Sequence, residues 1–298
     1  SRFLADETIN LPDLLAVALT EKLVTQSPVE AAELIWRDTQ SDSAIRRRGA
    51  ARAARALPPQ QQAKIAKHLM NDEAASVRSE VAAALLNAPV DHILPEATIA
   101  PLLDEYAKWL QQSADHPGSN VGLAQLARRR NDIVAAKQFY ERALTIDPAF
   151  LSARMAFADF LKEMGNARGE KRELKAALAT APDSGAVQFA YGLMLVREKQ
   201  YDEAAVHLEL AYQADDAIPR FAFVYGVSLW QLQRQNEAVK VLANAAARWP
   251  ADYDLLSTWA KYAYMSKNTA MLKKAAVALG NAYPNDSLYQ QLKPLIQP

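Results

Sequence analysis

Small and apolar residues recur at a fixed long interval in the carboxy-terminal two thirds of the chain. One series of small residues steps by 34 positions: Ala124, Ala158, Gly192, Gly226 and Ala260. A second series keeps the same step: Ala143, Ala177, Ala211 and Ala245. Prolines at 148, 182, 250 and 284 follow the same period, with Asp216 in the remaining place. A constant interval of this length predicts a stack of similar structural units.

Within each interval the pattern predicts two antiparallel helices. Large side chains of the first helix are expected to face the second: Leu123, Phe157, Tyr191 and Tyr225. Their expected counterparts on the second helix are Tyr140, Leu174, Leu208 and Leu242. The small residues let the two helices approach closely. Proline ends one helix and begins the next, because its ring fixes φ and it donates no hydrogen bond.

These residues resemble the tetratricopeptide repeat (TPR), a two-helix unit of this length. The predicted repeats are 117–150, 151–184, 185–218, 219–252 and 253–286. Repeat two departs from the pattern with Glu170 where alanine is expected, and repeat five with Leu272 and Leu279. A lead-in helix at 99–112 and a capping helix at 288–296 complete a predicted TPR array over residues 96–298.

Residues 1–95 follow a different period. Asp42 to Arg46 and Ala74 to Arg78, 32 residues apart, resemble the start of the second helix of a HEAT repeat. Expected first helices are 29–38 and 60–70, and Arg46 and Arg78 are expected to pair with Asp42 and Asp72. The predicted fold is therefore all-α, a right-handed α-α superhelix (solenoid) of HEAT-like and TPR helical hairpins. With no long flexible linker, the two parts are expected to stack continuously.

Composition excludes several kinds of chemistry. The chain has no cysteine, which excludes disulfides, thiolate zinc sites, a cysteine nucleophile and covalent haem attachment within it. The histidines lack metal-ligand spacing: His68, His92, His116 and His207. Neither a phosphate-binding loop nor a nucleophile elbow is present. We therefore predict a protein that is not an enzyme and binds no metal or cofactor itself.

Charge and hydropathy also limit the partners. Lys plus Arg and Asp plus Glu both number 34, and this balance disfavours a bulk nucleic-acid binder. The arginines at 46–48, 52 and 55 leave a nucleic-acid or anionic-lipid surface as an alternative, but a solvated, ion-paired helix face explains them better. No apolar run approaches the roughly 18 residues that span a membrane. The start, Ser1-Arg2-Phe3, indicates a processed end or a fragment of a longer protein.

The TPR resemblance implies where a protein or peptide partner would bind. In TPR arrays the first helices line a concave face, into which the second, fifth, ninth, twelfth and thirteenth positions point. Here these positions form an apolar cluster: Phe189, Leu193, Val196, Phe223, Val227, Trp230 and Tyr264. Basic positions on the same face are Arg128, Arg129, Lys162 and Arg197.

This face allows one further interpretation and argues against another. The apolar residues could instead pack between neighbouring first helices or against the last helix of the chain. A clamp for the carboxylate tail of heat-shock chaperones is disfavoured, because Val121 and Gln125 stand where that clamp has Lys and Asn.

HEAT-like units followed by TPRs also resemble the carboxy-terminal part of bacterial multihaem c-type cytochrome proteins. This resemblance implies a periplasmic scaffold that docks a redox partner, and a cytoplasmic location is the alternative. Two further possibilities stay open, a free-standing TPR adaptor in secretion, envelope assembly or regulation, and a non-catalytic module of a larger enzyme.

Overall fold

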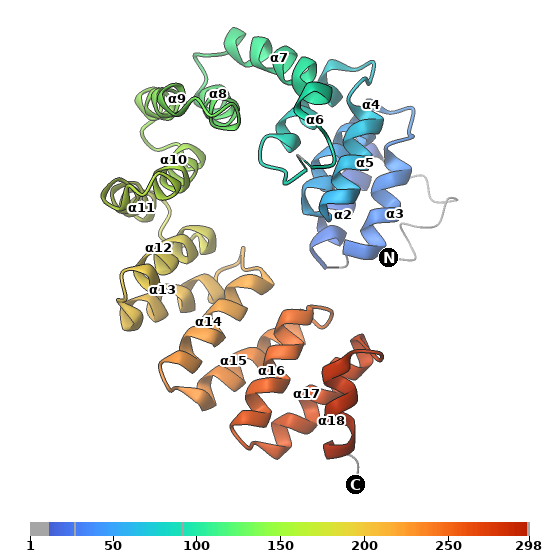
Figure 1. The fold of residues 1–298 in the computed structure, drawn as a ribbon, viewed down its shortest axis with the longest axis vertical. Helices are drawn as coiled ribbons and strands as arrows, with labels where there is room; N and C mark the ends of the chain where they lie inside the picture. Colours follow the sequence, from blue (N-terminus) through green and yellow to red (C-terminus); the bar gives the residue numbers. More distant parts are fainter. Residues whose placement is uncertain (1–11, 27, 91, 297–298) are drawn as a thin grey trace. The chain divides into compact units, whose positions relative to one another are not determined.

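The computed structural model describes residues 12–26, 28–90 and 92–296, and in these residues the chain is helical with no strand. It separates into two compact units, 1–153 and 154–298. Figure 1 shows successive antiparallel helical hairpins within each unit. The all-α solenoid of helical hairpins predicted from the sequence is confirmed as the fold class. The predicted division between residues 95 and 96 stays a prediction.

The first unit begins with shorter helices and ends with one complete 34-residue hairpin. Its described elements are α2 (Asp13–Gln26), α3 (Pro28–Asp38), α4 (Ala44–Ala53), η1 (Ala54–Ala56), α5 (Pro59–Leu69), α6 (Ala75–Leu85), α7 (Glu96–Gln112), α8 (Pro117–Arg129) and α9 (Ile133–Ile146). Helix α7 begins three residues before the predicted lead-in helix. It packs against both α6 and α8, so helix packing is continuous from α6 through α8.

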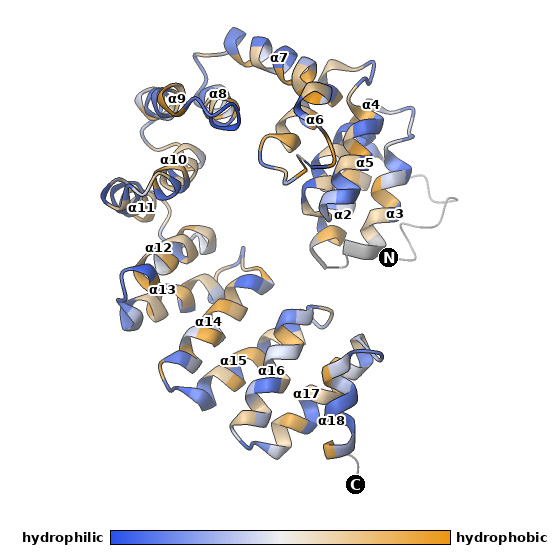
Figure 2. Cartoon of the chain, viewed as in Figure 1, coloured by the Kyte–Doolittle hydropathy of each residue, from blue (hydrophilic) through white to orange (hydrophobic). Residues whose placement is uncertain are grey.

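The second unit is a run of helical hairpins with a final helix. Its elements are α10 (Leu151–Glu163, which starts in the last residues of the first unit), α11 (Ala167–Thr180), α12 (Gly185–Arg197), α13 (Tyr201–Gln213), α14 (Pro219–Gln231), α15 (Gln235–Arg248), α16 (Tyr253–Met265), α17 (Thr269–Ala282) and α18 (Ser287–Ile296). Figure 2 shows that hydrophobic and hydrophilic residues are interspersed along these helices.

The 34-residue period sets where helices begin. The first helices start at Pro117, Leu151, Gly185, Pro219 and Tyr253, and α18 starts one further period on, at Ser287. The large residues expected between paired helices are all buried, at most 6% exposed. Burial of these side chains, at roughly 25 cal/mol per Å² of apolar surface, is the main force that holds each hairpin together.

The turns inside the hairpins repeat the same backbone geometry. The second residue beyond the end of each first helix has a left-handed φ, between 56° and 69°: Asn131, Gly165, Lys199, Gln233 and Lys267. The next backbone N–H donates back into the last turn of the helix, as from Asn166 to the Leu161 carbonyl oxygen at 2.8 Å. This arrangement is a Schellman motif, which satisfies carbonyl groups that the helix end leaves free. Glycine is present at only one of the five turns, so the other four accept some backbone strain.

The amino-terminal helices repeat at 31 residues, and the predicted step of 32 is wrong. Pro28 and Pro59 begin α3 and α5, and Ala44 and Ala75 begin α4 and α6. Arg47 and Arg78 are therefore the equivalent arginines. Each donates from Nη1 to the two main-chain carbonyls five and six residues before it, at 2.7–3.0 Å.

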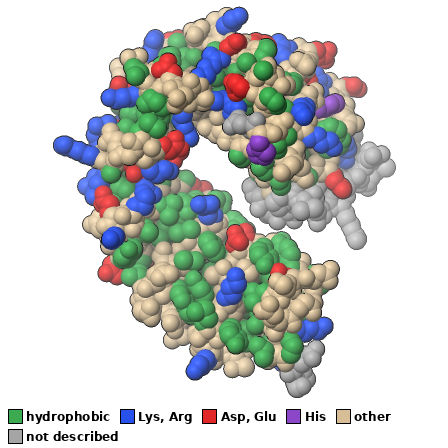
Figure 3. All heavy atoms as spheres, in the orientation of Figure 1, with side chains coloured by type: hydrophobic (Ala, Val, Ile, Leu, Met, Phe, Trp, Pro, Cys, Tyr) green, Lys and Arg blue, Asp and Glu red, His purple; other side chains and the backbone are tan. Residues whose placement is uncertain are grey.

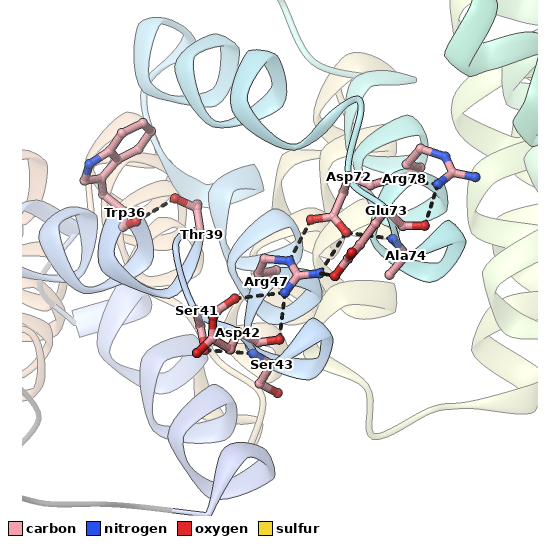
Figure 4. A network of polar contacts seen from close by, with 10 residues as sticks. All are labelled: Trp36, Thr39, Ser41, Asp42, Ser43, Arg47, Asp72, Glu73, Ala74 and Arg78. Carbon is pink, nitrogen blue, oxygen red and sulfur yellow. Dashed lines mark hydrogen bonds and ion pairs between the residues drawn. The ribbon is translucent and has the colours of Figure 1, made fainter.

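The predicted ion pairs of this region are corrected by the same shift. Asp72, the expected partner of Arg78, instead binds Arg47, with Nε 2.7 Å and Nη2 3.0 Å from the two carboxylate oxygens (Figure 4). Arg46 binds Asp13 at 2.7 Å instead of Asp42. Arg78 reaches only the main chain of Asp72, and its carboxylate partner is Glu105 at 2.6 Å.

The Arg47–Asp72 pair is largely removed from solvent, with side chains 10% and 6% exposed. Burial opposes ionisation of Asp72, but hydrogen bonds from Arg47 and from the Ala74 backbone outweigh it and lower the pKa of Asp72. Because that pKa is lowered on folding, Asp72 stabilises the native state above its unfolded pKa, and this stabilisation is lost as the pH falls through the folded value.

We predict that Asp72→Asn lowers the free energy of unfolding by about 3 kcal/mol at neutral pH, because it leaves a buried guanidinium without its charge partner. The deficit should shrink below about pH 4, where the wild-type carboxyl also begins to protonate. Urea unfolding followed by circular dichroism between neutral and acidic pH measures both effects.

The matched control is Glu73→Gln, which removes the other carboxylate near Arg47, a side chain that is 87% exposed and 3.3 Å away. Its cost should be below about 1 kcal/mol at any pH. Equal costs for the two variants would contradict the assigned role of Asp72.

Candidate partner-binding groove

The first helices of the second unit line a groove, referred to below as the α10–α12 groove. A pocket of about 270 Å³ lies in it, between α10 and α12 with α11 beneath. Its lining is Met155, Ala158, Asp159, Lys162, Glu170, Leu174, Phe189, Ala190, Leu193 and Arg197. Four predicted binding residues therefore meet in one cavity: Lys162, Phe189, Leu193 and Arg197.

Two ion pairs flank the apolar wall of this pocket. Lys162 binds Asp159 one turn earlier on α10, and Arg197 of α12 binds Glu170 of α11. Arg197 is 46% exposed, whereas its carboxylate partner is 7% exposed. The cationic groups are thus at the rim of the pocket and the Glu170 carboxylate is deep within it.

Glu170 occupies a place that alanine fills in other hairpins, namely Ala136, Ala204 and Ala238. Burial raises the pKa of Glu170, and the nearby charges of Arg197 and Lys162 offset this only in part. Neighbouring Glu173 is also buried but receives hydrogen bonds at 2.9 Å from Arg154 and 2.8 Å from Arg172. The groove therefore contains an acidic group that its own cations compensate incompletely.

Aromatic rings connect successive first helices along this face. Phe189 of α12 stacks on Phe221 of α14 with centroids 4.5 Å apart, and it is 9% exposed. Trp230 of α14 stacks on Tyr262 of α16 at 4.0 Å with the rings 17° apart. Both rings therefore contribute to packing between neighbouring first helices, which is the alternative that the sequence left open.

The remaining predicted residues of this unit keep part of their surface in solvent. Leu193, Val196, Phe223, Val227 and Trp230 are half-buried, and Tyr264 is 56% exposed. Leu193, Val196 and Trp230 pack against the buried cluster that contains Phe221 and Tyr225. Figure 3 shows hydrophobic side chains gathered over the second unit. This face is thus continuous with the core and partly open, so it combines packing with an available apolar surface.

The predicted basic residues of the first unit have a different setting. Arg128 lies near the end of α8 and is half-buried. Arg129 is directed into the unit, with Nη1 donating to the Leu85 carbonyl at 3.0 Å and Nη2 bound to Glu96 at 3.1 Å. Its side chain is 9% exposed, so the expectation that Arg129 offers a basic surface to a partner is wrong. Arg129 instead links the end of α6 to the start of α7.

Sequence reasoning missed Glu170 as a groove residue. The signal was present, because a carboxylate at a repeated alanine position must either be solvated or find a cation. The pattern did not indicate which cation pairs with Glu170, because that cation, Arg197, belongs to the next repeat. Met155 and Asp159 occupy the fifth and ninth positions of their repeat and also line the pocket, although they are not among the binding residues predicted from the sequence.

Comparison with known proteins bears on the helical hairpins of the fold. Residues 118–150, which contain α8 and α9, match the family model of the tetratricopeptide repeat. The match agrees with the first predicted repeat, 117–150. No curated protein matches the sequence significantly.

Solved structures share the fold over most of the chain. Yeast Tom70 aligns with a TM-score of 0.63 and 12% identity, covering 97% of this chain and 63% of Tom70. PilW, a widely conserved type IV pilus biogenesis factor, aligns with a TM-score of 0.52 and 14% identity, covering 74% of this chain and 99% of PilW. At these identities the similarity shows the fold alone, which is that of a TPR-type solenoid.

Weaker similarities include YrrB, a TPR protein with an unusual peptide-binding site, at a TM-score of 0.47 and 18% identity over 63% of this chain and 96% of YrrB. A similarity at that TM-score supports no conclusion about binding here. Among the described residues, no helix is long and apolar enough to cross a membrane, and no group of three potential metal ligands gathers.

We predict that Glu170→Gln removes one pH-dependent component of stability. Because burial raises the pKa of Glu170, the folded state binds its proton more tightly than the unfolded state does. Wild-type stability should therefore gain a contribution as the pH falls from neutrality through the folded pKa, and Glu170→Gln should lack it. Urea unfolding at about pH 7 and about pH 5 compares the two proteins.

Glu237→Gln is the control of opposite sign. A hydrogen bond from Arg234 lowers the pKa of Glu237, so its stabilising contribution is lost, not gained, on acidification, and only below the ordinary glutamate pKa of about 4.3, outside the range compared for Glu170. If wild type and Glu170→Gln respond identically to pH, the carboxylate is not buried as described.

Proposed function

We propose that this protein is a non-catalytic scaffold that binds an apolar segment of a protein partner in the α10–α12 groove. The TPR-type fold fits a role in protein–protein interaction, and this fold carries no catalytic machinery of its own by default. The observation that supports the groove is the pocket in which Leu193 and Met155 stand half-buried beside Phe189. Apolar side chains that converge in a concave site are the usual source of binding energy.

The proposed partner chemistry follows from the lining. First helices α12 and α14 each carry a single charged residue, Arg197 and Arg220. A partner segment rich in charge would lose its hydration on this face without compensation. A segment with large apolar side chains would instead displace water from Leu193, Phe223 and Val227, while Lys162 and Arg197 at the rim could meet polar groups at its edge.

We predict that Leu193→Asp abolishes binding of peptides selected on the wild-type protein from a random phage-displayed library. The selected peptides should be enriched in aromatic and aliphatic residues. A carboxylate in the centre of the groove should weaken them by at least about 10-fold, the order expected for a central interface residue. Fluorescence anisotropy with the labelled peptides measures the affinities.

Val206→Asp is the matched control, because Val206 is an apolar side chain of α13 that is 57% exposed and lies outside the pocket lining. It should bind the peptides as the wild type does. Retained binding in Leu193→Asp, or equal loss in both variants, would refute the groove assignment. Circular dichroism confirms that each variant is folded.

We further propose that the scaffold is a periplasmic docking module of a multihaem cytochrome or redox assembly. Support comes from the resemblance of the sequence, in which HEAT-like units precede TPRs, and the alternatives are a free-standing adaptor and a module of a larger enzyme. The visible absorption spectrum of the native full-length polypeptide distinguishes them. A haem band that survives denaturation is expected, and a colourless protein would contradict the cytochrome proposal.

A further inference from the structure

Three arginines on one face of α4 and η1 converge on a single carboxylate. Arg48, Arg52 and Arg55 donate to Glu80 of α6 from 3.4, 3.1 and 2.9 Å respectively. Their spacing of four and three residues places them on the same side of the helical segment. This group is referred to below as the arginine face.

The arginine face has more positive than negative charge. The three arginine side chains are 44–50% exposed, whereas Glu80 beneath them is 12% exposed. Of the other described carboxylates, Glu21 pairs with this face, 3.7 Å from Arg52 and beyond hydrogen-bond distance. Among the described residues, these three guanidinium groups share two carboxylates, so the face carries net positive charge. Because Glu80 already holds them together, little side-chain entropy remains to be lost on binding an anion.

The positive surface is short. Neighbouring arginines are bound to other carboxylates, Arg46 to Asp13 and Arg78 to Glu105. From Arg48 to Arg55 the helical rise is about 10 Å, at 1.5 Å per residue. Such a length matches a few acidic side chains of a peptide. A nucleic acid would need an extended basic track.

A pocket adjoins the arginine face within the same unit. It has a volume of about 300 Å³, and Arg55 forms part of its wall. The other lining residues are Gln62, Ala83, Ala84, Asn87, Ala88, Pro89 and Gln125. Among the described residues that line it, none is a carboxylate. The amides of Asn87 and Gln125 can each donate to and accept from a peptide backbone, and the alanines leave room for the chain.

We propose that the arginine face and this pocket bind an acidic segment of a partner protein. Carboxylates of the segment pair with Arg48, Arg52 and Arg55, and its backbone lies in the pocket against Asn87 and Gln125. Charge complementarity carries the proposal, because an incoming carboxylate neutralises the uncompensated guanidinium and forms charge-assisted hydrogen bonds with it. This surface belongs to the first unit and is independent of the α10–α12 groove.

The test uses a fluorescein-labelled glutamate-rich peptide and its glutamine counterpart, measured by anisotropy on the full chain. Wild type should bind the glutamate peptide, and the triple variant Arg48→Gln/Arg52→Gln/Arg55→Gln should bind it at least about 10-fold more weakly. Glu21→Gln removes a competing carboxylate without touching the arginines, so it should bind the peptide more tightly. Asn87→Ala/Gln125→Ala should weaken binding with no change of charge.

The control for net charge is Lys175→Gln/Lys240→Gln/Lys273→Gln, three exposed positions on second helices of the other unit. It loses the same charge and should keep wild-type affinity at about 150 mM salt, where distant charges are screened. Equal weakening in this control, or unchanged binding in the triple arginine or the Asn87/Gln125 variant, would overturn the proposal. So would tighter, arginine-dependent binding of single-stranded DNA or of phosphatidylserine vesicles than of the peptide.

Discussion

Close contact between the two helices of each hairpin is the constraint on which the other features depend. The eighth position of every repeat is small and buried: Ala124, Ala158, Gly192, Gly226 and Ala260. A Cβ on Gly226 would lie 2.8 Å from Cγ of Leu242, so the facing leucine already fills the space that a side chain would need. With this contact in place, residues at the fifth and ninth positions of the first helix can line the groove, as Phe189 and Leu193 do. The exposed surface of the repeat array follows from its packing.

The 34-residue repeat was readable from sequence because one contact recurs in every hairpin. The amino-terminal register was not, because Arg46, Arg47 and Arg48 are adjacent and identical. Successive residues of a helix point about 100° apart, so each of the three meets a different neighbour. Arg46 binds Asp13, Arg47 binds Asp72 and Arg48 binds Glu80. The rotation of α4 about its own axis decides which carboxylate each arginine meets, and this rotation cannot be read from the sequence.

Repeat positions could predict which residues line the groove, but not which contacts those residues make. Repeat positions identified Leu193 and Lys162, which the structure places in one pocket. Stacking of Trp230 on Tyr262 depends on how far neighbouring first helices are separated, a quantity that emerges only from packing. Arg129 shows the converse, since its repeat position predicts a partner contact but the preceding helix α7 supplies Glu96 and captures it. A contact between a repeat and a helix outside the repeat array cannot be predicted from the repeat pattern.

Apolar surface in the second unit and clustered arginines in the first give the chain two chemically different surfaces, of which the apolar groove is central to its proposed role. Site-specific photo-crosslinking tests that role most directly, with benzoylphenylalanine at Leu193 or at Val206 of the full-length protein in its own cells. We expect one discrete adduct from Leu193, identifiable by mass spectrometry, and none from Val206. The same adduct from both positions, or none from Leu193, would contradict a partner-binding groove on the first helices.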